Sequence, residues 1–266
     1  MPLRLLSTDF DGTLFAELQE PPVAPSVQAA IGRWQARGAR WIINTGRDLA
    51  SLTDALGRAR LAVQPDFLVL VEREIYQREA GRYVGFVDWN ARCARCHEEI
   101  FARLRPALPR LAGWVRERFA ATVYEDAYSP FCLILPTAGN ADATHAYLDA
   151  FCRDVPGLVV VRNDVYMRFS HADFNKGTAL AEICRRLGVP ADAVFAAGDH
   201  FNDLPMLETG RARWLAAPAN AVPQVKQAVR RQGGHVSGLP HGDGVAEALE
   251  SLFARRAAAS VSAARQ

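Results

Sequence analysis

Hydrophobic residues in the first third of the chain form short unbroken runs, separated by segments with helical spacing. Residues 3–8, 41–43 and 67–71 are the apolar runs, and residues 27–37 repeat apolar side chains every three or four positions. The leucines that follow residue 48 predict another helix with one apolar face. Unbroken apolar strands that alternate with helices are typical of a parallel sheet covered on both faces.

The same alternation returns in the last third of the chain. Residues 178–187 predict a helix that Gly188 ends, and residues 194–197 predict a short apolar strand. Residues 204–207 predict the start of a helix, and residues 214–216 predict one more strand. The two ends of the chain therefore contribute to one α/β domain.

The middle of the chain has a different pattern. Residues 90–105 and 141–153 predict long helices, whereas residues 131–135, 158–162 and 165–169 alternate more clearly between apolar and polar positions. This pattern predicts an α+β domain inserted into the α/β domain.

The predicted division makes the core discontinuous. We expect residues 1–76 and 172–266 to form the α/β core and residues 77–171 to form the inserted domain. A chain of 266 residues is long enough for two such units.

Composition narrows the class of partner. Half of the residues are hydrophobic, 23% are charged and the net charge is +2, so we expect neither a nucleic-acid nor a membrane partner. No apolar run reaches the roughly 18 residues of a membrane helix, and the N-terminus does not resemble a signal peptide. We therefore expect a cytoplasmic protein whose five cysteines are reduced thiols. The sequence gives no indication of the oligomeric state.

Polar residues of complementary kinds follow the predicted strands and turns. Asp9, Thr45 and Asp199 each follow an apolar run, and Lys176 precedes a helix. Ligands of open parallel sheets bind beyond the carboxyl ends of the strands, so these side chains can meet at one site. Only two of the 31 basic residues are lysines, Lys176 and Lys226, which suggests that position 176 needs a compact point charge.

The segment Asp9-Phe10-Asp11-Gly12-Thr13 is the strongest single signal. Aspartates two residues apart on a strand share a face, and the Gly12 turn can direct the carbonyl of Asp11 inward. Carboxylates beside an ammonium group and a hydroxyl suit a divalent cation together with a phosphate. The alternative for this segment alone is a strand followed by an ordinary Asp-Gly turn.

Four ordered segments together resemble the haloacid dehalogenase superfamily, and their spacing is similar to its Cof-like and sucrose-phosphate-phosphatase-like branch. The resemblance covers both core segments and implies a Rossmann-like parallel-sheet core with an inserted α+β cap domain of type 2. The four segments are Asp9-Phe10-Asp11-Gly12-Thr13, Asn44-Thr45-Gly46-Arg47, Asn175-Lys176-Gly177 and Gly198-Asp199-His200-Phe201-Asn202-Asp203.

The resemblance implies catalytic roles for the first motif. Asp9 would be the nucleophile that forms an aspartyl-phosphate, and Asp11 would be the general acid and base. Mg²⁺ would be bound by Asp9, the carbonyl of Asp11 and Asp199, with Asp203 as a ligand or as a partner behind the ligands.

The other motifs would bind the phosphoryl group and the substrate, and the resemblance assigns this role to Thr45, Gly46, Arg47, Lys176 and Asn202. Arg47 can instead cap its own turn. The resemblance implies a phosphatase that acts on a small phosphate ester. The substrates of the family are often sugar phosphates, so we expect a sugar phosphate here.

The spacing locates the cap between the second and third motifs. Thr45 and Lys176 lie 131 positions apart, more than the core needs. The family often has Asn-Gly-Ala after the third strand, whereas this chain has Val71-Glu72-Arg73-Glu74, which leaves the branch and the sugar preference open. Tyr128, Arg168, His171 and Asp173 lie in regions where specificity residues are expected, but each can equally be a surface or packing residue.

Other functions remain to be weighed. Cys93-Ala94-Arg95-Cys96-His97 matches the haem attachment pattern or part of a zinc site, although it lies in a predicted amphipathic helix where the cysteines can simply pack. A phosphotransferase or phosphomutase could use the same aspartyl-phosphate. A phospho-accepting receiver module also uses Asp, Thr and Lys, but it is about half as long and has no cap.

Overall fold

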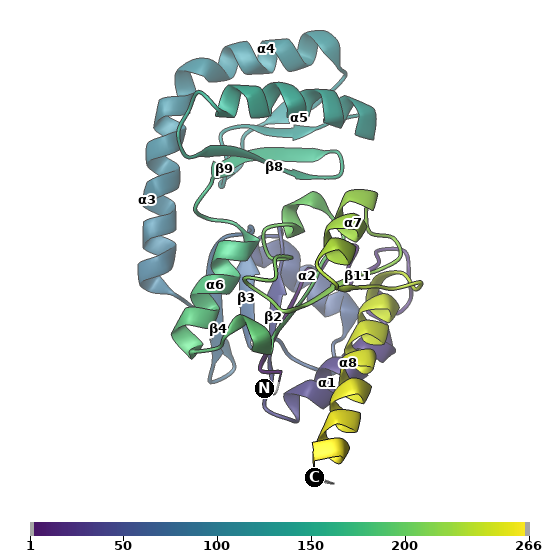
Figure 1. Cartoon of the computed structure of the whole chain (residues 1–266). Coiled ribbons are helices and arrows are strands. Elements are labelled where there is room, and N and C mark those ends of the chain that lie inside the picture. Colours follow the sequence, from purple (N-terminus) through teal and green to yellow (C-terminus); the bar gives the residue numbers. More distant parts are fainter. Residues whose placement is uncertain (1–2, 264–266) are drawn as a thin grey trace.

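The computed structural model describes the backbone of residues 3–263 and the side chains of residues 3–254. An α/β core lies below a smaller α+β cap, and the helix α3 rises from the core along one side of the cap (Figure 1). The described part of the last helix, α8, ends at the side of the core remote from the cap (Figure 1). The α/β class with an inserted α+β part agrees with the prediction.

The core is built on an eight-stranded sheet of order β12-β11-β10-β1-β2-β3-β4-β5. The strands from β12 to β3 are parallel, whereas β4 and β5 add an antiparallel edge. The bounds are β1 Leu5–Thr8, β2 Arg40–Asn44, β3 Phe67–Leu70, β4 Glu74–Glu79, β5 Arg82–Gly85, β10 Val194–Ala197, β11 Trp214–Ala217 and β12 His235–Val236.

Helices cover both faces of this sheet. One apolar cluster joins β1, β2 and β3 to α1, α2 and α8, and a second joins the opposite face to α6, α7 and the start of α3. Burial on both faces explains why the central strands are apolar at every position. The bounds are α1 Pro25–Gln35, α2 Leu49–Ala59, α3 Val87–Leu104, α6 Lys176–Leu187, α7 Pro223–Arg231 and α8 His241–Ala263.

The cap packs helices α4 and α5 against a four-stranded antiparallel sheet of order β6-β7-β9-β8. Figure 1 shows these helices on the side of the cap sheet that faces away from the core. The bounds are α4 Leu108–Arg118, α5 Ala138–Cys152, β6 Thr122–Tyr124, β7 Cys132–Ile134, β8 Leu158–Asn163 and β9 Tyr166–His171.

Two details differ from the predicted elements. The core sheet continues through β4 and β5 to Gly85, beyond the predicted core boundary at residue 76, because β4 pairs with β3 along its buried edge. The helix predicted from residue 204 does not form: Phe201–Asp203 is a 3₁₀ turn, and residues 204–206 continue as hydrogen-bonded turns.

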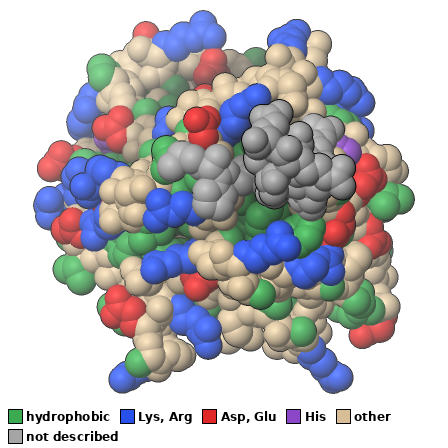
Figure 2. Space-filling view, turned by 60° about the horizontal axis from the view of Figure 1, so that its bottom comes forward, with side chains coloured by type: hydrophobic (Ala, Val, Ile, Leu, Met, Phe, Trp, Pro, Cys, Tyr) green, Lys and Arg blue, Asp and Glu red, His purple; other side chains and the backbone are tan. Residues whose placement is uncertain are grey.

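The surface carries both signs of charge. Figure 2 shows basic and acidic side chains interspersed on the face opposite the cap, as the small net charge leads one to expect. Within the described residues, no helix is both long and apolar enough to span a membrane.

Candidate active site at the carboxyl edge of the core sheet

The register of the central strands gathers the motif residues at one edge. Thr8 at the end of β1 lies opposite Ala197 of β10 and Ile43 of β2. The residues that follow these three positions therefore emerge side by side beyond the strands. Asp9 also donates its backbone N–H to the carbonyl of Ala197 at 2.9 Å, which fixes the first turn after β1.

Lys176 enters the site from the first turn of α6. Asn175 caps this helix by accepting hydrogen bonds from the N–H groups of Gly177 and Thr178, in a capping box. Asn44 at the end of β2 donates to the backbone carbonyl of Lys176 at 3.0 Å. These contacts hold the backbone of residue 176 while its side chain is fully buried in the site.

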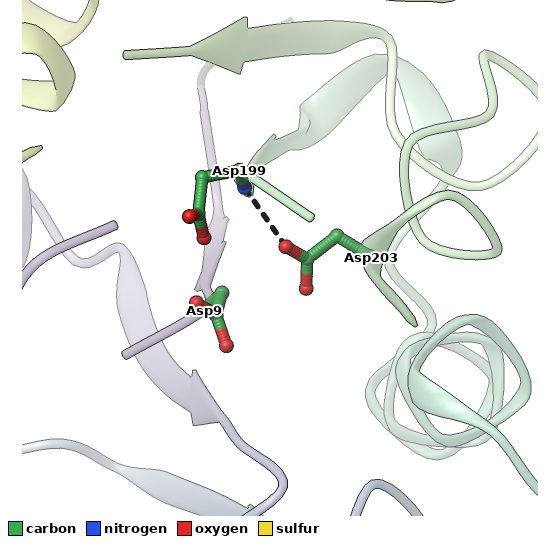
Figure 3. Close-up of side chains that lie close together, drawn as sticks. All are labelled: Asp9, Asp199 and Asp203. Atoms are coloured by element: carbon green, nitrogen blue, oxygen red, sulfur yellow. Dashed lines mark hydrogen bonds between the residues drawn. The ribbon is translucent and has the colours of Figure 1, made fainter. Parts of the chain in front are cut away.

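Three carboxylates surround the end of this lysine. Lys176 Nζ donates to Asp9 Oδ1 at 2.5 Å and to Asp203 Oδ1 at 2.7 Å. One ligand atom each from Asp9, Asp199 and Asp203 lie within 4.8 Å of one another, and all three side chains are buried or nearly so (Figure 3). We call Asp9, Asp199 and Asp203 the acidic cluster.

Asp203 is the member most occupied by protein partners. Its Oδ1 accepts from Lys176, and its Oδ2 accepts from the backbone N–H groups of Asp199 and His200 at 2.8 and 3.0 Å (Figure 3). Asp203 therefore holds the loop that carries Asp199 and orients the lysine. This is the behaviour of a partner behind the metal ligands, one of the two roles considered for Asp203 from the sequence.

Burial and mutual repulsion act on the acidic cluster. Desolvation, followed by the charge of Asp203, raises the pKa of Asp9 well above its ordinary value and raises the pKa of Asp199 to about 7. The pKa of Lys176 is also raised, because the attraction of Asp203 and Asp9 outweighs the desolvation of the ammonium group. Lys176 is thus a fixed positive charge. The positive charge around Asp9 and Asp199 does not offset their burial and mutual repulsion.

The acidic cluster fits a divalent cation. Its carboxylates are the oxygen ligands that Mg²⁺ prefers, and three carboxylates against one ammonium leave a surplus of negative charge in a buried site. Thr13 donates to Asp199 Oδ1 at 2.8 Å and so orients this carboxylate. A Cβ atom on Gly12, whose φ is +77°, would collide with the Asp199 carboxylate, so the glycine leaves the space that this carboxylate occupies.

Asp11 has a different set of partners. Arg47 donates to it through Nε at 2.8 Å to Oδ2 and through Nη2 at 2.6 Å to Oδ1. Arg47 also bonds to Ser51 in the first turn of α2. The carboxylates of Asp9 and Asp11 are therefore held by two different cations, and Arg47 contacts the candidate acid rather than the lysine-bound cluster.

The second motif provides a hydroxyl and a close backbone approach. Thr45 is fully buried, and its Oγ1 accepts the N–H of Arg47 at 3.1 Å. Glu72 donates its backbone N–H to the carbonyl of Thr45 at 2.9 Å, and its carboxylate lies beside Gly46. Asn202 donates to Glu72 Oε1 at 2.8 Å, and its buried Oδ1 has no hydrogen-bond partner among the described residues.

Several contributors were missed from the sequence. The carbonyl of Gly12 accepts hydrogen bonds from Asn220 Nδ2 at 2.7 Å and from His241 Nδ1 at 2.9 Å, so the turn after Asp11 is held by the loop before α7 and the start of α8. Glu72 was noticed only as a departure from a family pattern. These contacts join residues that are far apart in the chain, so no local spacing of residues predicts them.

The cap covers one side of the site. A cavity of about 390 Å³ is lined by β8 of the cap, by the loop after β10 and by Glu72 and Lys176 of the core. The cap contacts the core there, because Asp164 donates its N–H to the imidazole of His200 at 3.1 Å. The cavity is thus bounded by both parts of the molecule.

The Cys93–His97 segment has a packing role in α3. Cys93 is buried, and His97 Nδ1 lies 2.8 Å from the carbonyl of Cys93. His97 Nε2 accepts the backbone N–H of His171 at 3.1 Å and lies 3.1 Å from Ser170 Oγ. A carbonyl only accepts and a backbone N–H only donates, so His97 carries its proton on Nδ1 and joins α3 to the end of β9.

The fold and the site define an α/β protein with a cation-suited acidic centre at the carboxyl edge of its sheet. Comparison with known proteins agrees with this description of the fold and the site. A family model for haloacid dehalogenase-like hydrolases matches residues 120–249. This match agrees with the resemblance that the sequence motifs carry.

Curated relatives align over part of their length. A phosphoglycolate phosphatase of Methanothrix thermoacetophila is 30% identical over 140 residues, which are 53% of this chain and 59% of the relative. One from Pyrobaculum aerophilum is 38% identical over 109 residues, 40% of this chain and 45% of the relative. The chain thus spans about half the length of these relatives. The putative phosphatase YxeH of Bacillus subtilis is 23% identical over 86% of this chain and 92% of its own.

Solved structures share the whole fold at low identity. The sucrose-phosphatase of Synechocystis sp. PCC6803 superposes with a TM-score of 0.71 and 20% identity, covering 94% of this chain and 98% of that chain. A haloacid dehalogenase-like hydrolase of Bacteroides thetaiotaomicron gives a TM-score of 0.62 at 18% identity, covering 94% and 99%. At these identities the likeness concerns the fold.

Proposed function

We propose that the protein is a Mg²⁺-dependent phosphatase that hydrolyses a small phosphomonoester through an aspartyl-phosphate on Asp9. The observation that carries this proposal is the bond from Lys176 to Asp9 inside the acidic cluster, at the sheet edge where ligands of such folds bind. The phosphatase names of the relatives support the same reaction class.

Asp9 acts as the nucleophile. Its buried carboxylate attacks phosphorus in line with the ester oxygen, so that an O–P bond to Asp9 forms as the ester O–P bond breaks. Lys176 lies 2.5 Å from this carboxylate and favours its ionised form, against the burial and the charge of Asp203 that raise the pKa of Asp9. Asp9 and Asp199, with the carbonyl of Asp11, would hold Mg²⁺, which would supply positive charge that lets carboxylate and phosphate approach each other.

Asp11 moves the protons. It gives its proton to the departing ester oxygen and later takes one from the water that attacks the aspartyl-phosphate. To reach the leaving group, the carboxyl of Asp11 must leave the guanidinium of Arg47, which donates to both of its oxygens. The hydroxyl of Thr45 and the N–H of Gly46 bind the oxygens of the transferring group, and Lys176 neutralises their charge.

The substrate class follows from the cap and the relatives. A leaving group would occupy the cavity between β8 and the core, which Glu72, Asn202 and Lys176 help to line. Sugar phosphates are the substrates expected from the sequence, and phosphoglycolate is the compound that the relatives' names supply. Both belong in the first assay.

The experiment is phosphate release by the purified full chain from sugar phosphates, phosphoglycolate and p-nitrophenyl phosphate, with Mg²⁺ or with EDTA. We expect multiple turnovers with Mg²⁺ that stop in EDTA and return when Mg²⁺ is added back. Release that EDTA leaves unchanged would refute the metal requirement. Phosphate transfer to a sugar acceptor, without release to water, would refute hydrolysis in favour of a phosphotransferase.

A further inference from the structure

Two arginines cross the boundary between core and cap in opposite directions. Arg73, in the turn between β3 and β4, donates through Nη2 to the carbonyl of Tyr128 in the cap at 2.8 Å. Arg168, on β9 of the cap, donates through Nη2 to the carbonyl of Val71 in the core at 2.9 Å. We call Arg73, Arg168 and the neighbouring Glu72 the boundary cluster.

The boundary cluster is buried and carries more positive than negative charge. Arg73, Arg168 and Glu72 are 5%, 4% and 6% exposed. Glu72 pairs with Arg168 at 3.4 Å, whereas Arg73 makes no ion pair with any described residue. Burial, followed by the repulsion of Arg168, lowers the pKa of Arg73. Glu72 and Glu74 attract Arg73 only from a distance, and a buried guanidinium that makes no ion pair is costly, so Arg73 can take a further negative partner.

Unused hydrogen-bond donors point to the same deficit. Arg73 Nη1 and Arg168 Nε are buried and have no hydrogen-bond partner among the described residues. Both donors belong to guanidinium groups, which bind the paired oxygens of carboxylates and phosphates. An incoming anionic group would satisfy the missing charge and the missing hydrogen bonds together.

The cluster adjoins the second motif of the candidate site. Glu72 bonds through its backbone to Thr45, and its carboxylate is in van der Waals contact with the position that a Cβ on Gly46 would take. Val71 and Glu72 both have left-handed backbone, with φ of 44° and 68°. This conformation is unfavourable for a β-branched residue, and strain of this kind gathers at functional sites.

We propose that Arg73 and Arg168 bind a second anionic group of the substrate, a carboxylate or a second phosphate carried by the leaving group. This inference rests on the proposed function and narrows it to phosphate esters with an acidic leaving group, in preference to neutral sugar phosphates. The reacting phosphate would lie at Lys176 and the second anion at the boundary cluster, which meets the cavity beside β8 at Glu72.

A purely structural role gives a different expectation. If the arginines only join cap to core, replacing either one affects every substrate alike. If they bind the second anion, replacement changes the ratio between substrates. The decisive quantity is therefore kcat/KM for an acidic ester divided by kcat/KM for a neutral one, measured on the same preparation.

The experiment uses the full chain with Mg²⁺ and four esters: phosphoglycolate, fructose 1,6-bisphosphate, glucose 6-phosphate and p-nitrophenyl phosphate. The wild type is expected to prefer at least one of the first two over glucose 6-phosphate by about tenfold or more. Phosphoglycolate leading identifies a carboxylate, and the bisphosphate leading identifies a second phosphate. Arg73→Gln is expected to lower the preference about tenfold, and Arg73→Lys to restore part of it.

The controls separate the possible failures. Arg95→Gln removes an exposed arginine of α3 and is expected to leave the preference unchanged. Inhibition of the wild type by glycolate, competitive with the ester, tests the anion site even if the Arg73 variants fail to fold. Release from neutral esters as fast as from acidic ones would overturn this inference and leave the phosphatase intact. No release from any ester would count against the proposed function itself.

Discussion

The carboxylate of Asp11 accepts two hydrogen bonds from the guanidinium of Arg47, from Nη2 to Oδ1 at 2.6 Å and from Nε to Oδ2 at 2.8 Å. This ion pair holds Asp11 away from the leaving group that it is proposed to protonate. Arg47 fixes where Asp11 lies, and both oxygens of the carboxylate accept hydrogen bonds from it, so Asp11 must be released from this contact before it can reach the leaving group.

Replacing Arg47 is therefore expected to impair catalysis without removing the nucleophile. Arg47→Ala frees the carboxylate of Asp11, and we expect kcat to fall about tenfold, the size of one partly exposed charge-assisted contact. Arg47→Lys should lose less, since an ammonium group still holds one oxygen. Steady-state kinetics on an alkyl phosphate checks this, and a kcat equal to that of the wild type in Arg47→Ala would argue against a positioning role.

Asp11→Asn separates the two half-reactions. Release of p-nitrophenolate needs no proton, so we expect one rapid equivalent of p-nitrophenol followed by turnover slower by about 10² to 10⁴. An alkyl phosphate should show no such burst, because its leaving oxygen needs the missing acid. Stopped-flow absorbance measures the burst; continued fast turnover in the variant would remove Asp11 from the mechanism.

Lys176→Met tests the buried charge at the centre of the site. The substitution leaves Asp9 and Asp203 without their shared cation, and we expect the free energy of unfolding to fall by about 3 kcal/mol or more. Added Mg²⁺ should recover part of this loss by supplying positive charge. Urea unfolding with and without Mg²⁺ measures both effects.

Lys226→Met is the matched control for that variant. The ammonium group of Lys226 donates only to the carbonyl of Ala219, at 2.8 Å, and it meets no carboxylate among the described residues. We expect a loss of about 1 kcal/mol or less. Equal losses of unfolding free energy in the two variants would show that the charge of Lys176 contributes no more to stability than that of Lys226.

His97 predicts how stability depends on pH. Burial, followed by the charge of Arg73, lowers its pKa to about 3 in the folded protein, against about 6.5 in an unfolded chain. Between these values the unfolded state binds the extra proton, so the stability that His97 confers is complete above pH 6.5 and declines as the pH falls towards 3.

His97→Gln should remove that part of the pH dependence. We expect the loss of unfolding free energy between pH 6.5 and pH 5 to be about 2 kcal/mol smaller in the variant than in the wild type. The variant will also be less stable at pH 7, where it lacks the bonds to Ser170 and His171. Urea unfolding across this range is the measurement, and parallel curves would contradict the assignment.

The core and its motifs could be predicted from the sequence, because both depend on local patterns of residues. The unbroken apolar run before Asp9 reflects burial of β1 between two parallel neighbours, and the register of those neighbours brings Thr45 and Asp199 to the same edge. Leu204 was misjudged because apolar spacing favoured a helix, whereas Asp203 folds back onto the N–H groups of Asp199 and His200 and forms a tight turn instead.

The contacts across the boundary could not be predicted in the same way. Glu72 and Arg168 lie 96 positions apart and meet only because β9 of the cap descends onto the turn after β3. The partner of Asp11 was open for a similar reason, since Arg47 could equally have faced the substrate. Local periodicity describes elements, and these side chains depend on how two separate parts pack.

The most direct test of the account is phosphate release by Asp9→Asn, compared with the wild type under the same Mg²⁺ concentration and substrate. The variant keeps the shape of the side chain and can still accept a hydrogen bond from Lys176, so its unfolding curve should show an intact fold. We predict no detectable turnover, because an amide cannot form the aspartyl-phosphate. Appreciable turnover by the folded variant would contradict Asp9 as the nucleophile, and with it the proposed mechanism.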